Sequence, residues 1–434
     1  MSTSSIRSIR VLKETSFGQL AAATLEPDLS AFDGEADVEL DATRAELTVI
    51  GDAVVIEHDS PRGGFYDVPG DPESITAAAG GLYRVRRGAL TLTIPLEGYG
   101  SADADDCPIS WLLSAGLPGI DTSIASGPEA VASDATAQTF GVDDSSDWIL
   151  GGLIGVTRIG KLLELSSIVE LGVGTVGHSP AFGAELDGQT VRPLRTWSSK
   201  IASIGASLAF KIDGHGFRSY AFGCRPSSYS LKSNGRRIDL TVELQCALVV
   251  DDHANAGTDG ANVGDQPFRS GGVVMHSMGA EVVVSGAIDT GAASYPRVTG
   301  RTVLSVDAWE ATITNVLDPV GAAVSRSVLG MSEMEVVSRS AEVKLTVTPT
   351  ATLDGALWDR SHRHLALGFG PGGAAGSGGG ILLMGAFLKT DASKRITSNP
   401  RVQQELVFGA GAWRGDAGDA TDVSNCAIKI GLVL

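Results

Sequence analysis

The chain has 434 residues, of which 43% are hydrophobic and 19% are charged, and it contains 55 glycines. This composition excludes a wholly disordered chain, and the glycines indicate the many turns of a loop-rich β protein. The formal net charge of −18 disfavours a dedicated nucleic-acid binder, because the summed field repels polyanions.

Neither the cysteines nor the hydropathy indicates a secreted or membrane protein. The four cysteines are too far apart for a CxxC metal clip or a dense disulfide framework, so we expect them to be reduced core residues: Cys107, Cys224, Cys246 and Cys426. Met1–Arg10 lacks the apolar run of a signal peptide, and no stretch of about 18 apolar residues occurs. These features predict a protein that is made in the cytoplasm and has no membrane partner.

The N-terminal third is expected to contain an arm, a hairpin and a long loop. Residues 1–35 are rich in Ser, Ala and Thr with little periodicity, which predicts an extended arm that is ordered by docking. Two β-branched runs, 45–50 and 53–57, flank Gly51-Asp52 and predict a two-residue hairpin. Glycines and prolines then predict a loop over 59–81.

A strand and a short helix follow this loop. A strand is predicted over 82–87, and Leu90, Leu92 and Ile94 alternate with threonines before Pro95 ends the ladder. Residues 107–116 predict a helix, with Pro108 at its first position and Gly116 at its end. The helix is long enough to cover one end of a sheet.

The middle of the chain combines a poorly patterned region with the clearest strand signal. We interpret residues 123–197 as an insertion that contains some strands. Strands are predicted over 207–212 and 217–223, and apolar residues then alternate with mostly polar ones over 238–248. Residues 251–270 are rich in Gly, Asn and Asp and predict a linker.

The last third also predicts a β structure. Further strands are expected over 273–284, 302–306, 310–316, 342–348, 364–367, 381–388, 405–408 and 427–434. The segments Ile238–Val242 and Val343–Val347 share an apolar, charged, Leu-Thr-Val pattern, which favours two related halves. The resulting hypothesis is an arm over 1–35, a first half over 36–265 with the insertion at 123–197, and a second half over 266–434.

The motifs for chemistry are weak, so no catalytic, cofactor-binding or metal-binding residue is predicted. His362 and His364 share a strand face, but two ligands do not close a metal site. Gly368–Gly373 has the letters GxGxxG without a following helix, which favours a loop between paired strands. The acidic loop residues lack the spacing of an EF-hand: Asp251, Asp252, Asp259 and Asp265. The GxSxG motif is also absent, and the sequence predicts a protein that is not an enzyme.

Several segments follow one another in a distinctive order, and the most specific of them run from a strand with a glycine into a leucine-rich helix. The segments are Lys13–Gly18, Arg87–Leu92, Leu96–Gly100, Pro108–Leu117, Tyr220–Pro226, Ile238–Leu248, Glu342–Pro349, Asp354, Trp358 and Leu365–Gly370. In this order they resemble the tail tube proteins of long-tailed, siphovirus-like bacteriophages. The resemblance covers most of the chain except about 123–197.

This resemblance implies a structural virion protein located in the phage tail and made in the host cytoplasm. Such subunits join their sheets edge to edge into rings, and the rings stack through N-terminal arms and long loops and contact other tail proteins. The genome passes through the lumen without specific binding. If both halves are tube-like, three chains would form a ring with pseudo-six-fold symmetry, whereas a single tube domain would need six. The similarity between Ile238–Val242 and Val343–Val347, the internal echo of the sequence, favours three chains per ring.

The acidic charge agrees with a lumen that DNA passes without sticking. Asp239 and Glu243 are candidates for the lumen because they oppose the buried face of their strand. The alternative function is a monomeric β-sandwich adhesin or carbohydrate-binding module, which the missing signal peptide disfavours. A third, a hydrolase on a β scaffold, would require a reactive serine or carboxylate pair that the sequence does not indicate.

Overall fold

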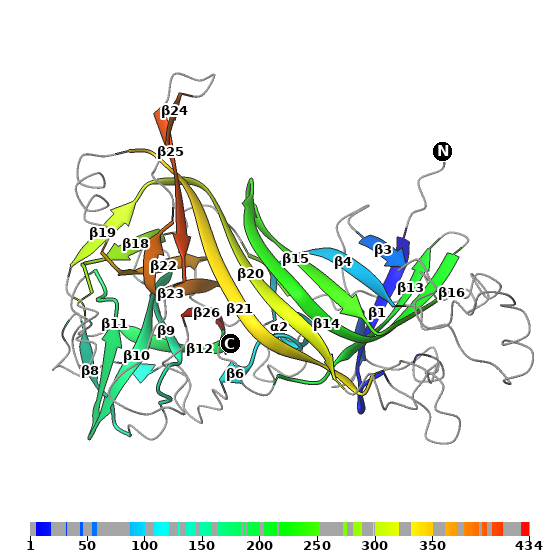
Figure 1. Cartoon of the computed structure of the whole chain (residues 1–434). Coiled ribbons are helices and arrows are strands. Elements are labelled where there is room, and N and C mark those ends of the chain that lie inside the picture. Colours follow the sequence, from blue (N-terminus) through cyan, green and yellow to red (C-terminus); the bar gives the residue numbers. More distant parts are fainter. Residues whose placement is uncertain are drawn as a thin grey trace, which may run out of the picture.

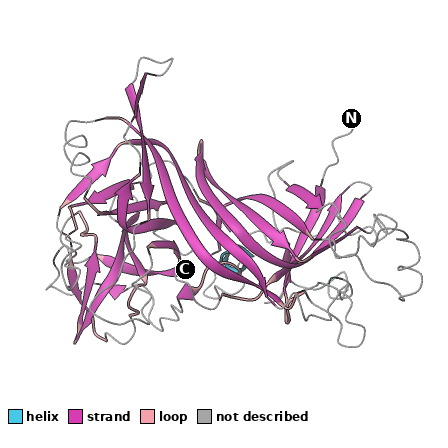
Figure 2. Cartoon of the chain, in the orientation of Figure 1, coloured by secondary structure: helices cyan, strands magenta, loops and turns pink. Residues whose placement is uncertain are grey.

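A computed structural model shows a mainly antiparallel β protein, and its described part contains one α-helix (Figure 2). The mainly-β fold class with few helices is thereby confirmed. The structure describes residues 6–18, 32, 44–46, 54–58, 87–99, 108–120, 129–130, 136, 138–144, 148–157, 163–183, 186, 189–199, 204–214, 217–251, 272–275, 281–288, 298, 300–320, 331–349, 361–370, 377–389, 393–396, 402–410 and 427–433.

A long curved sheet runs through the centre of the molecule and connects two groups of strands (Figure 1). Every pair of neighbours in it is antiparallel. Its strands, in spatial order, are β3 (Val54–His58), β4 (Gly88–Pro95), β15 (Arg237–Cys246), β14 (Phe217–Asn234), β20 (Val306–Val320), β21 (Glu333–Val347), β25 (Val402–Gly409) and β24 (Ser393–Ile396).

The first half of β14 leaves the long sheet and enters a smaller sheet at one end of the molecule. The other strands of this sheet are β2 (Arg44–Glu46), β1 (Ile6–Lys13), β13 (Leu208–Gly214) and β16 (Leu248–Asp251). A separate two-stranded sheet pairs β5 (Glu97–Tyr99) with β17 (Gly272–Val274). The smaller sheet therefore shares one continuous strand with the long sheet.

The end of the molecule opposite the smaller sheet holds the remaining strands, which we call the third strand group. These strands fold into two layers. One layer contains β19 (Arg301–Leu304), β18 (Glu281–Ser285), β22 (Arg363–Phe369), β23 (Gly379–Leu388), β26 (Ile428–Val433) and β12 (Thr190–Ser198), with β6 (Gly119–Ile120) and β7 (Glu129–Ala130) beside β12. The other contains β9 (Leu153–Thr157), β10 (Leu163–Gly172), β11 (Thr175–Ser179) and β8 (Thr139–Gly141). Buried residues including Leu163, Leu165 and Leu382 fill the space between the layers.

The main hydrophobic core lies against one face of the long sheet. It contains the buried leucines and valines of β4, β15 and β21 together with the helix α2 (Pro108–Ser114), whose Leu112 and Leu113 are fully buried. Burial of this apolar surface is the dominant stabilising term. The helix begins at Pro108, where a missing backbone N–H costs nothing, and ends before Gly116. The predicted helix over 107–116 is confirmed.

Most of the expected strands are confirmed. The alternating segment 238–248 forms β15 and β16, and its apolar residues Ile238, Leu240, Val242 and Leu244 are buried. The ladder after Gly88 ends at Pro95 as predicted. The expected strand 310–316 lies within β20, and the expected strand 342–348 lies in β21 except for its last residue. Both observed strands are longer because each pairs along most of its length with the other.

The predicted hairpin over 45–57 differs from the observed pairing. In the part of the chain that the structure describes, β2 pairs with β1 and β3 pairs with β4, so these two segments enter different sheets. The turn at Gly51-Asp52, residues 82–86 of the strand expected over 82–87, and almost all of the linker over 251–270 lie outside the described residues.

Within the arm expected over 1–35, residues 6–13 form the extended strand β1, whose partners belong to the same chain, and residues 15–18 turn after it. β1 pairs with β13 along its length, and Ile9 and Val11 are buried in the main core. Residues 6–13 are therefore a strand of the smaller sheet, in which the alternate residues Ile9 and Val11 supply a buried face.

Strand pairing crosses the proposed boundary at residue 265. β14 pairs with β20, and β12, from the region interpreted as an insertion, pairs with β26. Residues 123–197 supply β7 to β12 of the third strand group. The chain is therefore not divided at 265 into two independent sheets.

The two echo segments nevertheless occupy equivalent positions. Ile238–Val242 lies in β15 and Val343–Val347 lies in β21, and these strands flank the central β14–β20 pair on opposite sides. In the register of the sheet, Asp239 lies opposite Lys232, Lys232 opposite Glu310, and Glu310 opposite Lys344. The two segments are thus placed symmetrically about the centre of the long sheet.

Candidate functional site

The face of the long sheet that points away from the main core is polar. Along β15, Thr241, Glu243 and Gln245 alternate with the buried apolar residues and point to the opposite side. The same alternation occurs in β14, β20 and β21. We call this surface the polar face.

A row of hydroxyl groups crosses the polar face. The register places Thr93, Thr241, Ser230 and Thr312 opposite one another on β4, β15, β14 and β20, and Glu342 of β21 continues the row. The hydroxyl oxygens of Thr93 and Thr241 are 3.0 Å apart and share a hydrogen bond. Such cross-strand pairs stabilise the sheet and leave short, uncharged side chains on its surface.

Two further rows flank the hydroxyl row. One contains Thr91, Glu243, Ser228, Thr314 and Ser340. The other alternates in charge as Asp239, Lys232, Glu310 and Lys344. Opposite charges directly across a ladder attract one another, so this row contributes to the register of the central strands.

The structure separates the two carboxylates that the sequence suggested for a lumen. Glu243 is exposed on the polar face. Asp239 lies in the same strand but is only 2% exposed, because its carboxylate accepts hydrogen bonds from Asn234 Nδ2 at 2.6 Å and Arg237 Nε at 2.8 Å. Its charge is therefore largely neutralised within the sheet.

Other carboxylates of the face are also paired. Lys389 lies 2.9 Å from Glu342, and Lys344 lies 3.3 Å from Glu405. These exposed pairs contribute little to stability, but they balance the local charge. The three rows of the polar face are therefore rich in hydroxyl groups, and their lysines lie opposite or beside carboxylates.

The long sheet ends in two edge strands of opposite direction. In the described residues, β3 pairs with β4 alone and β24 pairs with β25 alone. The eight strands of the long sheet alternate in direction. Because their number is even, the two edge strands β3 and β24 run antiparallel to each other. Unpaired N–H and C=O groups at such edges are templates for pairing with another chain.

A cluster of donors from the long sheet binds the C-terminal end of α2. The carbonyls of Leu112 and Leu113 accept hydrogen bonds from the Tyr229 hydroxyl at 2.8 and 3.1 Å. Gly116 O accepts from Arg339 Nη2 at 2.8 Å and from Asn315 Nδ2 at 3.3 Å. The last carbonyls of a helix have no partner within the helix, and cations next to them are favourable.

Two of these donors are held in the required state by their surroundings. Burial raises the pKa of Tyr229, so its hydroxyl stays protonated and remains a donor. Asn315 Oδ1 accepts from Arg339 Nε at 2.9 Å, which fixes the orientation of both side chains. The helix is thereby fixed to β14, β20 and β21.

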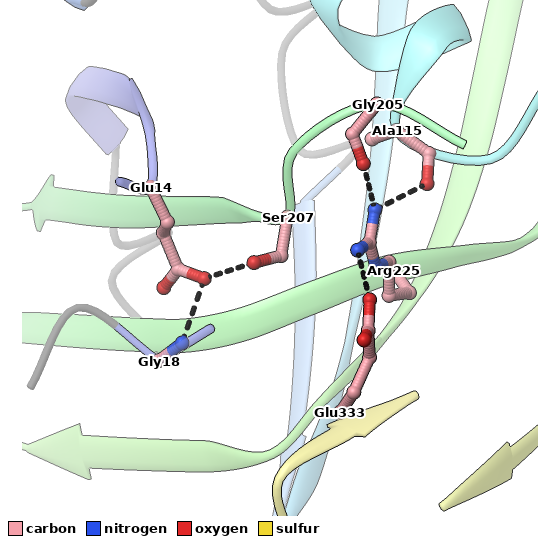
Figure 3. A network of polar contacts seen from close by, with 7 residues as sticks. All are labelled: Glu14, Gly18, Ala115, Gly205, Ser207, Arg225 and Glu333. Carbon is pink, nitrogen blue, oxygen red and sulfur yellow. Dashed lines mark hydrogen bonds and ion pairs between the residues drawn. The ribbon is translucent and has the colours of Figure 1, made fainter. Parts of the chain in front are cut away.

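Arg225 and Glu14 connect the helix end to the N-terminal segment (Figure 3). Arg225 donates to the carbonyls of Ala115, at 3.2 Å, and Gly205, and it pairs with Glu333 at 3.0 Å. Arg225 is 3% exposed, whereas the Glu333 side chain is 47% exposed. The guanidinium therefore lies at the boundary between the core and the surface.

The carboxylate of Glu14 is almost fully buried and accepts three hydrogen bonds. The donors are Gly18 N at 2.9 Å, Gly223 N at 2.8 Å and the Ser207 hydroxyl. Burial raises the pKa of Glu14 to about 7, although these donors and Arg225 act in the opposite direction. Glu14 thus fixes the end of β1 to the start of the long strand β14.

The raised pKa of Glu14 predicts a pH-dependent stability. A carboxyl with a higher pKa in the folded than in the unfolded state stabilises fully below about pH 4.5, and this contribution declines as the pH rises to about 7. We expect the free energy of unfolding to fall by about 2–3 kcal/mol from this group between those values. Urea unfolding at pH 5 and pH 8 measures the change.

Glu14→Gln removes the titrating group and should flatten this pH dependence, whereas Glu333→Gln, at a half-exposed carboxyl, is the matched control and should leave it in place. An unchanged pH slope in Glu14→Gln would show that another group is responsible.

The hydrogen bonds of Glu14 and Arg225 bring together segments that are far apart in the sequence. Glu14 and Gly18 belong to the segment 13–18, Gly223 and Arg225 to the segment 220–226, and Ala115 to the segment 108–117. Asn315 and Arg339 were not predicted. The sequence contained one indication of the role of Asn315. It follows Trp309, Ala311 and Ile313 at alternate positions on the buried side of the strand, where a polar side chain requires hydrogen-bond partners.

The other candidate motifs gain no function from the structure. His364 is fully buried, and burial together with Lys429 lowers its pKa to about 3, while His362 Nδ1 lies 3.0 Å from Gly385 O. Gly368 and Phe369 lie in β22, which pairs with β23, and residues 371–373 of the GxGxxG segment lie outside the described residues. Within the described residues, no group of three or more His, Cys, Asp or Glu residues could hold a metal ion.

A shallow pocket of about 380 Å³ lies in the third strand group and is lined by Thr136, Gln138, Phe182 and Arg301 among others. Arg301 already pairs with Glu164, at 3.4 Å, and with Glu281. These carboxylates oppose the binding of an anion at this pocket.

Comparison with known proteins does not assign the chain to a family. Neither the protein-family models nor the curated proteins contain a match. No helix in the described part of the structure is both long and apolar enough to cross a membrane.

Proposed function

We propose that this chain is a structural subunit that joins with copies of itself into rings, which stack to form the tube of a phage tail. The observation that carries the proposal is the long sheet, whose even number of strands ends in the oppositely directed edges β3 and β24. Rotation about a ring axis would bring β24 of one copy next to β3 of the next as an antiparallel pair. Closure removes both exposed edges.

The polar face supports the use of such a ring as a DNA conduit in the virion. If it lined the lumen, the genome would meet hydroxyl groups, and lysines that lie opposite or beside carboxylates, instead of a basic surface. Lysine and arginine contacts bind DNA by releasing counterions, and a wall whose few cations are balanced by carboxylates would let DNA slide. The protein would act through assembly with itself and with other tail proteins, without catalysis or a cofactor.

The sequence similarity between Ile238–Val242 and Val343–Val347 is the basis for proposing three chains per ring, which would give pseudo-six-fold symmetry. The strand order adds no support, because the related pairs β14–β15 and β20–β21 run outward from the centre of the sheet as a local two-fold axis would place them. Stacking of rings would involve residues 1–35 and the long loops, most of which lie outside the described residues.

Lysines on the hydroxyl row should convert the lumen into a DNA-binding surface. For Thr93→Lys/Thr241→Lys/Thr312→Lys, we expect assembled rings to retain linear duplex DNA, with affinity falling at least about 40-fold between 50 and 200 mM salt, the value for phosphate contacts by the three lysines of a single chain. Closed circular DNA of the same sequence cannot thread a ring and should not be retained. A filter-binding assay measures both.

The matched control replaces the same threonines by glutamine, which adds length without charge and should leave DNA unbound, as in the wild type. Equal retention of circular and linear DNA by the lysine variant would place the polar face on the outside of the assembly. A wild-type preparation that sediments only at the chain mass of 44.6 kDa and binds glycans would favour the monomeric adhesin instead.

A further inference from the structure

Two buried cysteines face each other across the β14–β15 pair. The flanking pairs Arg225–Gln245 and Phe222–Leu248 have the same register, which places Cys224 directly opposite Cys246. Their sulfur atoms are 3.1 Å apart. Both are free thiols in the structure, and they come from positions 22 residues apart in the sequence.

The surroundings of the two thiols disfavour a metal site and favour a disulfide. Cys224 is 0% exposed and Cys246 is 2% exposed, and both belong to the main core. Within the described residues they have no third ligand with which to hold a metal ion. Cysteines directly opposite on neighbouring antiparallel strands have the Cα and Cβ separations that a disulfide requires.

We propose that Cys224 and Cys246 are a redox-active pair that forms an intrachain disulfide with a low-molecular-weight disulfide, such as oxidised glutathione, as the oxidant. One thiolate attacks the glutathione disulfide and releases one glutathione thiol. The second thiolate then attacks the mixed disulfide and releases the other. Two protein thiols and one glutathione disulfide thus become one protein disulfide and two glutathione thiols.

The position of the pair gives the bond a structural consequence. It would connect β14 to β15 at the point where β14 passes from the long sheet into the smaller sheet, next to Gly223, which binds Glu14. The bond would close the loop that contains the β14–β15 hairpin and restrict the unfolded chain. The proposal concerns this chain alone and holds whether or not it forms rings.

Burial predicts that the folded protein reacts slowly. It raises the pKa of the Cys224 thiol, so little of the reactive thiolate is present, and the oxidant has no direct access. The reduced pair should therefore persist in a reducing cell and oxidise readily only when the strands open or while the chain folds.

The test uses full-length protein with Cys107→Ser and Cys426→Ser, so that only the pair remains. One sample is refolded from denaturant in glutathione buffer with excess oxidised glutathione, and a second is incubated folded in the same buffer. After alkylation under denaturing conditions, tryptic digestion should give the peptides 219–232 and 238–269 linked to each other. We expect at least half of the refolded chains to be linked and the folded sample to react at least tenfold more slowly.

Thermal unfolding gives the second measurement. The linked protein should melt about 3 °C higher than the same protein reduced by dithiothreitol. The same protein with Cys246→Ala added is the control and should show no shift. The proposal would be overturned if both thiols stay free after refolding, or if they form only mixed disulfides with glutathione or bonds between chains.

Discussion

Replacement of Arg225 by methionine is expected to lower the free energy of unfolding by about 3–5 kcal/mol. The change removes the donor to the carbonyls of Ala115 and Gly205, of which Ala115 is fully buried and would be left without this partner. It also removes the cation next to the buried Glu14 carboxylate, whose charged form Arg225 stabilises. Urea unfolding at pH 7 measures the loss.

Two further variants distinguish the stability contributed by the several hydrogen bonds of the Arg225 guanidinium from that contributed by its positive charge. Arg225→Lys keeps a cation but cannot reach several carbonyls at once, so its loss should be intermediate. Glu333→Gln changes the half-exposed partner of Arg225 and should cost less than about 1 kcal/mol. Wild-type stability of Arg225→Met would contradict the assignment of this residue as the link between α2, β1 and the long sheet.

A proline in the edge strand β24 should abolish ring assembly without unfolding the chain. Lys394 and Arg395 are consecutive residues of β24, opposite Gln404 and Gln403 of β25. In an antiparallel edge strand, consecutive N–H groups point alternately to the paired and to the free side. One of Lys394→Pro and Arg395→Pro therefore removes a bond within the chain, and the other removes only a donor at the free edge.

The informative variant is the one whose melting temperature stays within about 2 °C of the wild type. We expect it to lower the assembled fraction at least tenfold in sedimentation velocity, because the proline blocks pairing with β3 of the next copy. Lys394→Ala and Arg395→Ala keep the backbone donors and should assemble normally. If both proline variants assemble like the wild type, β24 is not the contact edge.

The sequence predicted the strands better than their partners. The alternation over 238–248 identified β15 because its buried face is a local property of the segment. The hairpin predicted over 45–57 failed because β2 and β3 pair with strands other than each other, and pairing depends on contacts distant in sequence. Residues 123–197 lacked a clear pattern, although β12 of this region is bound on both sides by neighbouring strands.

The candidate site was visible in the sequence only as separate pieces. Thr91, Thr93, Thr241 and Thr312 each alternate with apolar residues in their own strands, but only the register places them near one another. Asp239 was expected to be a surface carboxylate, and it is buried because Asn234 and Arg237 reach it from the adjoining turn. Periodicity identifies the face of a residue, whereas its exposure depends on its neighbours.

The proposed assembly is tested most directly by negative-stain electron microscopy of the purified full-length chain at increasing concentration, combined with native mass spectrometry of the same sample. We predict rings or stacked rings with a central channel, and a ring mass of three chains. Particles that remain single chains at every concentration would contradict self-assembly through the edges of the long sheet.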